Sequence, residues 1–339
     1  MKFTTIFSLI SMLSISLSYA QNTLKELSSK TADSLKMVYL SNAAMKYPLL
    51  RQGFLSAEIL GRGNVDAELN GKSLYKGKSQ ISRIRSVFNI PIVQLGKNTI
   101  STTLSYLQQR VDVKNVQSFN HNIPSADFNY NKSTIGVTAS FTRLDSIFNR
   151  PVAYSISASG LTDELSRIRR FNYVGLVSIN LKRTATTSYS IGALLIVDPS
   201  SPSPFLPIFS YWHKFNSSDL ELFVDIPSRI MLRKQFSERT WVSFGTELSG
   251  NLAFFDFDKA LLPRDFTHSS IELKTGSSFE YLISKKIILG LNGGLMTTSS
   301  SRFFRKEDRP DDYFMKNKNE AIPYVNFSIS FLPFLRPLK

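Results

Sequence analysis

The feature that most constrains this chain is an alternation of apolar and polar residues that begins near Gly53 and continues almost to the C-terminus. After residue 132, for example, Ile135, Val137 and Phe141 alternate with small polar residues, and near the end Val325 and Phe327 do the same. A period of two places successive side chains on opposite faces of a β-strand. The sequence therefore predicts many strands, each with one apolar face and one polar face.

About a dozen to fourteen such segments occur, each near the 9–11 residues that a tilted strand needs to cross a bilayer. Turn signals such as Asn70-Gly71 and Ile226-Pro227-Ser228 separate them, and longer polar connections lie near 113–129, 253–267 and 299–319. We therefore predict an all-β fold, an antiparallel transmembrane β-barrel with an even number of strands, about 12 or 14. Short turns would lie at one rim and longer loops at the other.

Two soluble folds also produce alternation. A soluble β-sandwich carries mostly charged outer faces, whereas the polar positions here are mainly Ser, Thr, Gly and Asn. A filled soluble barrel is normally smaller than a chain of 339 residues. The length over which the alternation persists favours the membrane barrel, in which apolar residues face lipid and polar residues face a lumen.

The first residues have the pattern of an export signal. Lys2 precedes an uncharged, mostly apolar run over 3–17, and Ser18-Tyr19-Ala20 forms a small-residue cleavage site. We expect residues 1–20 to be removed, residues 21–50 to form a polar arm or a short helix, and residues 51–339 to form one barrel domain. No later run is long and apolar enough for a membrane helix. An exported chain of this kind is either soluble or embedded in a membrane as a barrel, and the resemblance described below implies the bacterial outer membrane as its location.

Composition excludes several kinds of chemistry. The chain has no cysteine, which excludes disulfides, thiol catalysis and cysteine-bound zinc. The formal net charge is +15, and a basic cluster lies at 167–170. In an exported barrel this excess points to lipopolysaccharide phosphates and small anionic solutes as partners, and not to nucleic acid.

Two neighbouring stretches carry a narrower resemblance. "GALLIVDPSSPSPFLPIFSYWHKF", followed by "LELFVDIPSRIMLRKQ", resembles a channel-like, porin-type family of bacterial outer-membrane β-barrels with no assigned function. The last strand resembles the signal read by the barrel-assembly machinery, with Phe327 and Phe331 in the matching positions. The chain departs from that signal because it continues through "LPFLRPLK" to a terminal lysine, so Phe334 is an alternative for the terminal aromatic position.

The strand periodicity also assigns side chains to the two faces. Charged residues on the polar face are the candidates for lining the lumen and setting its selectivity: Arg83, Arg85, Glu221, Asp225, Arg229, Arg233, Glu247, Glu272 and Lys274. Aromatic residues on the apolar face are candidates for the belts at the two membrane interfaces: Tyr106, Phe141, Tyr154, Tyr173, Tyr189, Phe279, Tyr281 and Phe331.

Motifs for catalysis or cofactors are weak. Gly71-Lys72-Ser73 lacks the earlier glycine of a phosphate-binding loop and fits a hairpin turn better. The three histidines have no metal-ligand spacing. His268 and Ser269 are adjacent on a strand and point to opposite faces, and His268 with Ser270 lacks the motif of barrel lipases. Carboxylates with basic neighbours fit ion pairs better than a protease site. We therefore expect no catalytic residues, no metal and no cofactor.

These observations favour a passive or semi-selective channel for small solutes with a charged lumen. The first alternative is a plugged barrel that acts as a scaffold or partner of a secretion or surface-assembly apparatus. The second is a barrel enzyme that acts on lipid or peptide. Whether the lumen is open or closed by its own ion pairs decides between the first two.

Overall fold

The computed structural model describes residues 29–121, 123–198, 201, 203–256, 262–306 and 308–338. Helix α3 (Ser29–Lys46) and the short 3-10 helix η2 (Pro48–Leu50) precede one large antiparallel sheet. The strands are β1 (Gly53–Leu69), β2 (Lys72–Leu95), β3 (Asn98–Ser118), β4 (Phe128–Ile147), β5 (Arg150–Thr162), β6 (Arg170–Arg183), β7 (Thr187–Val197), β8 (Phe205–Lys214), β9 (Leu220–Ile226), β10 (Arg229–Ser237), β11 (Thr240–Asp256), β12 (Asp265–Ser284), β13 (Ile287–Arg305), β14 (Met315–Asn319) and β15 (Ile322–Phe331).

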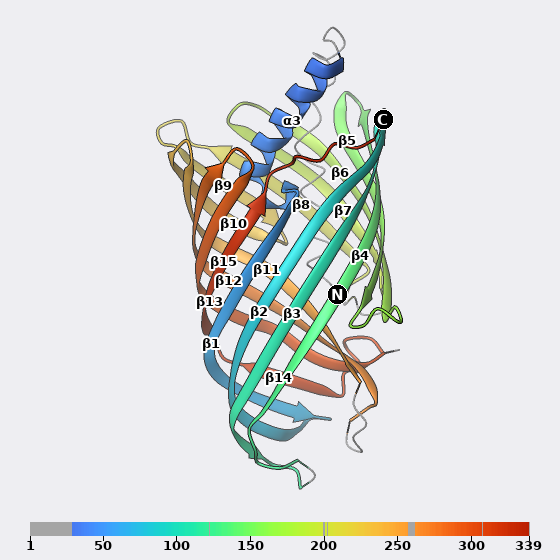
Figure 1. Cartoon of the computed structure of the whole chain (residues 1–339), viewed down its shortest axis with the longest axis vertical. Coiled ribbons are helices and arrows are strands. Elements are labelled where there is room, and N and C mark those ends of the chain that lie inside the picture. Colours follow the sequence, from blue (N-terminus) through green and yellow to red (C-terminus); the bar gives the residue numbers. More distant parts are fainter. Residues whose placement is uncertain are drawn as a thin grey trace.

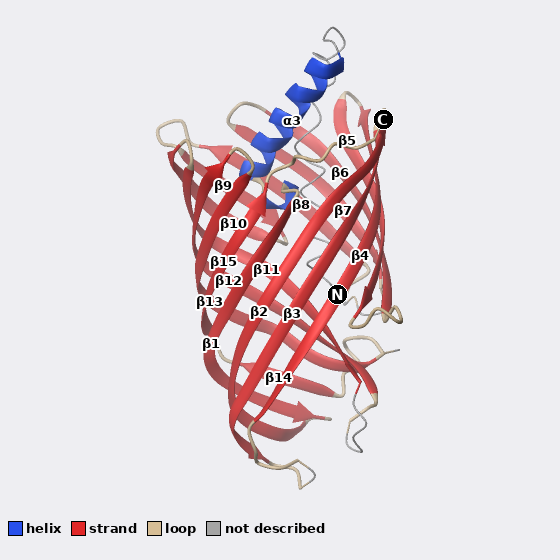
Figure 2. Ribbon diagram, viewed as in Figure 1, coloured by secondary structure: helices blue, strands red, loops and turns tan. Residues whose placement is uncertain are grey.

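The sheet closes on itself to form a barrel (Figure 1). From β1 to β13, each strand pairs with the next one along the chain, and the two short strands β14 and β15 both lie between β13 and β1. The predicted all-β antiparallel barrel is confirmed, and Figure 2 shows strands forming nearly the whole wall. Among the described residues, no helix is long and apolar enough to cross a membrane.

The two ends of the barrel differ. At the end that carries α3 and the C-terminus, which we call the helix end, the connections are 96–97, 148–149, 184–186, 215–219, 238–239 and 285–286 (Figure 1). At the opposite loop end, the connections are 70–71, 119–127, 163–169, 198–204, 227–228, 257–264 and 306–314. The predicted hairpin turn at the loop end forms, with Asn70 and Gly71 at φ of 49° and 78°.

The outer face of the barrel carries an apolar belt. Large apolar side chains are exposed on every strand except the short β14, for example Ile59 at 61%, Ile156 at 66% and Phe244 at 60%. Water-soluble proteins rarely expose apolar surface that is continuous around the molecule. A belt of this kind is the surface that a transmembrane β-barrel turns toward the hydrocarbon of a bilayer.

The strands differ in length around the barrel. Strands β1 to β4 and β11 to β13 have 17 to 24 residues, whereas β5 to β10 have 7 to 14. Because β10 pairs with β11 only as far as Glu247, the segment 248–256 extends beyond β10 and pairs with β12 alone. This segment reaches β4, where the Thr134 hydroxyl donates a 2.7 Å hydrogen bond to the Leu252 carbonyl. The loop end is therefore narrower than the helix end.

The chain after β15 folds back onto the helix end. Leu332 is buried, and the ring of Phe334 lies 6.2 Å from that of Phe88. Leu338 forms a parallel bridge with Val93, supported by backbone hydrogen bonds of 2.8 and 2.9 Å. The terminal residues predicted to follow the last strand thus lie along β2.

Candidate functional site

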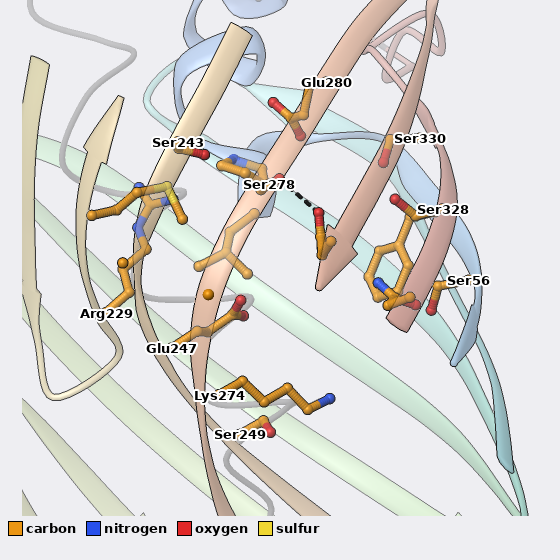
Figure 3. Close-up of a pocket in the computed structure, with 18 of the residues that line it drawn as sticks. Ser56, Arg229, Ser243, Glu247, Ser249, Lys274, Ser278, Glu280, Ser328 and Ser330 are labelled. Atoms are coloured by element: carbon orange, nitrogen blue, oxygen red, sulfur yellow. Dashed lines mark hydrogen bonds between the residues drawn. The ribbon is translucent and has the colours of Figure 1, made fainter. Parts of the chain in front are cut away.

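The predicted lumen residues lie on the inner side of the wall. Six of them line one cavity of about 290 Å³: Arg83, Arg85, Arg229, Arg233, Glu247 and Lys274. The other three form ion pairs with residues of the lumen: Glu221 with Lys46, Asp225 with Arg229, and Glu272 with Arg83. Figure 3 shows Arg229, Glu247 and Lys274 around this space, with serine hydroxyls of several strands completing its wall. Their role in selectivity stays a prediction.

A buried ion-pair cluster crosses the middle of the lumen. Arg83 binds Glu272 through two hydrogen bonds of 2.7 and 2.6 Å, and Arg83 Nη1 lies 3.2 Å from Glu58. Lys274 also pairs with Glu58, so the four residues form one network, which we call the central cluster. The side chains of Arg83 and Glu272 are only 3% and 2% exposed. A two-point contact between guanidinium and carboxylate is among the strongest polar contacts available, so this network joins β1, β2 and β12 across the lumen.

Three charged residues of this interior were not among the predicted lumen residues. Glu58 has the inward parity of β1, a strand whose faces were not assigned from the sequence. Glu280 shares the face of Glu272 and Lys274, and its partner is Arg51, 2.7 Å away, just before β1. The signal for Glu58 and Glu280 was the same alternation that identified the other residues. Arg51 lies outside any strand, so periodicity could not identify it.

A plug closes the helix end of the lumen. We define it as residues 43–51, the last turn of α3, η2 and Arg51. The described part of the predicted arm or short helix is thus helical, and its end enters the barrel (Figure 1). Its side chains pack with residues of the wall in one buried cluster: Ala43, Ala44, Tyr47 and Leu50 with Trp212, Phe223, Ile288 and Leu332. The rings of Tyr47 and Phe223 meet edge to face at 5.5 Å.

Few polar contacts hold the plug. Lys46 Nζ lies 3.4 Å from Glu221 and 4.3 Å from the centre of the Trp212 ring. Arg51 pairs with Glu280 and donates a 3.2 Å hydrogen bond to Ser330 Oγ. Burial raises the pKa of Tyr47 well above its usual range, so its hydroxyl stays neutral in the plug.

The inner face is not uniformly polar. Along β6 to β8 it carries a buried aliphatic cluster that includes Leu176, Leu194 and Ile208, and Leu49 of the plug packs against it. The expectation of a polar inner face is therefore wrong for these strands. The physical reason is that residues of the plug and of β11 pack against this side of the lumen. The inward side chains of β6 to β8 therefore form a packed core and do not face water.

Aromatic residues fill the loop end. Phe255 stacks on Phe266 at 5.0 Å, and Phe314 meets Phe266 edge to face at 5.5 Å. Tyr130 packs on Phe255 at 5.4 Å, which joins β4 to the projecting part of β11. In the part of the chain that the structure describes, the plug thus packs inside one end of the lumen and an aromatic core packs inside the other.

The basic cluster at 167–170 has a structural role at this end. Arg169 lies 2.8 Å from Asp163 and 2.5 Å from Asp265, so it ties the β5–β6 loop to the start of β12. Arg170 pairs with Asp198, and Arg167 pairs with Asp256 at the end of β11. Arg167 and Arg169 thus hold the projecting β11–β12 hairpin against the β5–β6 loop.

The histidine that raised the enzyme alternative has an unexpected partner. His268 Nε2 lies 2.9 Å from Ser301 Oγ on β13, and both residues are buried. No sequence motif connects the two, because the pair forms only when β12 and β13 align. The adjoining space is about 40 Å³, roughly the volume of one water molecule. The contact joins β12 to β13 in the interior of the barrel.

The predicted belt aromatics lie on the outer side, and none is buried. Five of the eight lie within eight residues of a helix-end connection along their strand: Phe141, Tyr154, Tyr189, Phe279 and Tyr281. Phe331 ends β15 at the same rim, and Phe327 shares its outward parity. Tyr173 lies near the loop end of the short wall, and Tyr106 lies between the rims. The belt and assembly roles stay predictions.

Among the described residues, no group of three or more His, Asp or Glu side chains is arranged to hold a metal ion.

Comparisons with known proteins give only a general likeness of architecture. No protein-family model matches the sequence, and no curated protein matches it significantly. An outer-membrane channel from Pseudomonas putida F1 is 9% identical over 83% of this chain and 96% of its own, with a TM-score of 0.35. The toluene transporter TodX of P. putida is 12% identical over 84% and 90%, with a TM-score of 0.30. The outer-membrane protease OmpT of Escherichia coli is 8% identical over 83% and 97%, with a TM-score of 0.24.

Proposed function

We propose that this protein is a bacterial outer-membrane channel for small solutes whose lumen is closed in the observed state. The observation that carries the proposal is the plug, which fills the helix end of the lumen above a polar cavity. The plug belongs to the N-terminal segment and is not part of the barrel wall, so it can move without breaking the strand ladder. A wall with an apolar outside and a charged inside is the architecture of a solute channel.

The short connections at the helix end support an orientation in which that end faces the periplasm. In this orientation, the plug and the C-terminus lie on the periplasmic side, as expected for a chain exported through a cleaved signal at residues 1–20, which lie outside the described residues. The belt would contact outer-membrane lipid and lipopolysaccharide, and insertion would use the barrel-assembly machinery.

Conductance across planar bilayers tests the proposal. We expect wild-type protein to show rare openings, and the double variant Lys46→Ala/Arg51→Ala to open much more often, because it loses both ion pairs that hold the plug. Arg110→Ala is the matched control, since Arg110 is exposed on β3 and, among the residues that the structure describes, pairs only with Asp112. If none of the three proteins conducts although each barrel is correctly folded, the channel proposal is refuted.

A second candidate function is favoured by the central cluster. Arg83 and Glu272 close the middle of the lumen independently of the plug, and the aromatic core closes the loop end. A barrel that stays closed would serve as a scaffold or partner of a surface-assembly apparatus. Persistent silence of the plug variant together with an Arg83→Met variant would favour this role over the channel.

A further inference from the structure

We propose that the cavity beneath the plug is a binding site for a small hydroxylated organic monoanion, of the size and chemistry of a sugar acid. This inference deepens the proposed channel function, since it names the class of solute that the closed lumen holds.

The charges of the cavity wall do not balance. Five basic side chains each have a carboxylate within ion-pair distance: Lys46, Arg51, Arg83, Arg229 and Lys274. Together they use five carboxylates: Glu58, Glu221, Asp225, Glu272 and Glu280. In the part of the chain that the structure describes, Arg85 and Arg233 have no such partner, and Glu247 is the one lining carboxylate left over. One positive charge therefore remains in excess, and a single anionic group would neutralise it.

Arg233 has no carboxylate partner among the described residues because Glu221, which faces it, pairs with the plug instead. In the register of β9 and β10, Arg233 is directly opposite Glu221. The Glu221 carboxylate instead pairs with Lys46 of the plug at 3.4 Å. The Arg233 guanidinium lies over the Trp241 ring, 5.0 Å from its centre, and no carboxylate of the described residues is within ion-pair distance of it. The seated plug thus leaves Arg233 available to an anion.

Buried donors without partners point to the same space. Among the described residues, Arg233 Nε, Arg229 Nη2 and Ser249 Oγ have no hydrogen-bond partner, and all three side chains line the cavity. Arg229 and Arg233 are only 8% and 5% exposed. A buried guanidinium N–H without an acceptor is costly, so acceptor oxygens from a ligand are the natural complement.

The rest of the wall suits hydroxyl groups. Serine residues from several strands line the cavity, including Ser56, Ser243, Ser278 and Ser328 (Figure 3). A serine hydroxyl both donates and accepts, which matches the hydroxyl groups of a polyol. The volume of about 290 Å³ corresponds to roughly ten water molecules at ~30 Å³ each, enough for a compact molecule of about that many heavy atoms. A carboxylate on a hydroxylated chain satisfies both the arginines and the serines.

Titration calorimetry on the full-length folded protein in detergent tests this site with two probes, sodium gluconate and glucose. We expect gluconate to bind at least tenfold more tightly than glucose, because only gluconate supplies the negative charge. Arg233→Gln should weaken gluconate binding at least tenfold, and Arg85→Gln should also weaken it. Arg110→Gln should leave it unchanged, since Arg110 is exposed and remote from the cavity. The difference in electrophoretic mobility before and after boiling confirms folding of each variant.

Equal affinity of wild-type protein for gluconate and glucose overturns the proposal, and this comparison needs no variant to fold. Wild-type affinity in both Arg233→Gln and Arg85→Gln overturns it as well. The outcome is separable from that of the conductance test. A conducting barrel that does not distinguish the two probes refutes the site alone, whereas a silent barrel that binds gluconate refutes the channel alone.

Discussion

The central cluster gives the sharpest quantitative prediction. The variant Arg83→Met removes the partner that binds Glu272 through two short hydrogen bonds. Glu58 keeps Lys274, but Glu272 keeps only the 3.2 Å hydrogen bond from Ser270 Oγ among the described residues. The variant therefore leaves the Glu272 carboxylate, whose side chain is 2% exposed, without its counter-ion.

The cost follows from that burial. Removing one partner of a buried ion pair typically costs ~3–5 kcal/mol, because the remaining charge has lost its compensation. At ~1.4 kcal/mol per factor of ten, this lowers the folding equilibrium constant by at least a hundredfold. The double variant Arg83→Met/Glu272→Met removes both charges, so we expect it to be more stable than Arg83→Met alone.

Urea unfolding of the protein in phospholipid vesicles measures these differences. Arg110→Met is the control, because Arg110 and Asp112 form an exposed pair, 61% and 33% accessible, whose loss should change the free energy of unfolding by less than ~1 kcal/mol. If Arg83→Met costs no more than the control, or if the double variant is the less stable of the two, the central cluster is not the compensated network that its geometry indicates.

Three further predictions concern the plug, the belt and the loop end. Lys46→Glu should raise the frequency of channel opening by repelling Glu221, and adding Glu221→Lys should restore closure, measured as conductance in planar bilayers. Ile59→Arg should destabilise the barrel in vesicles by ~2–4 kcal/mol if this 61% exposed residue lies near the bilayer midplane, measured by urea unfolding. Burial acts to raise the pKa of Asp163, but the hydrogen bond and charge of Arg169 hold it below its usual range. Because this pKa is depressed, the Asp163–Arg169 ion pair stabilises the β5–β6 loop at neutral pH, and that stabilisation is lost as pH falls below ~3.9. Cleavage of the loop by an acid-active protease should therefore increase below that pH. In the Asp163→Asn variant, the loop should be cleaved at higher pH as well.

The parts of the fold that depend on near neighbours could be predicted from sequence. In "LELFVDIPSRIMLRKQ", alternation puts the charged residues on one face, and a two-residue turn aligns Asp225 with Arg229 and Glu221 with Arg233. The 2.7 Å pair between Asp225 and Arg229 is therefore a local consequence of a hairpin. The same alternation identified the apolar face, because a period of two is a local property of each strand and does not depend on distant strands.

Contacts across the lumen could not be predicted in this way. Arg83 and Glu272 are 189 positions apart, and they meet because closure of the sheet brings β2 and β12 to the same part of the lumen. The plug is equally hidden, because Ala43, Ala44 and Tyr47 form no pattern that marks a lumen-filling segment. Leu194 and Ile196 interrupt the alternation of β7 because they pack in the lumen, which periodicity alone cannot distinguish from an irregular strand.

The ion pairs of this barrel therefore fall into two classes with separable effects. Pairs within a hairpin, such as Asp225 with Arg229, hold residues that the backbone ladder already aligns. Pairs across the lumen, such as Arg51 with Glu280 and Arg83 with Glu272, join segments that no ladder connects. If the lumen opens as we propose, the pairs of the second class have to break, whereas the strand ladders of the wall need not change. Variants of Arg51 and Arg83 should therefore alter conductance while the strand content of the barrel stays the same.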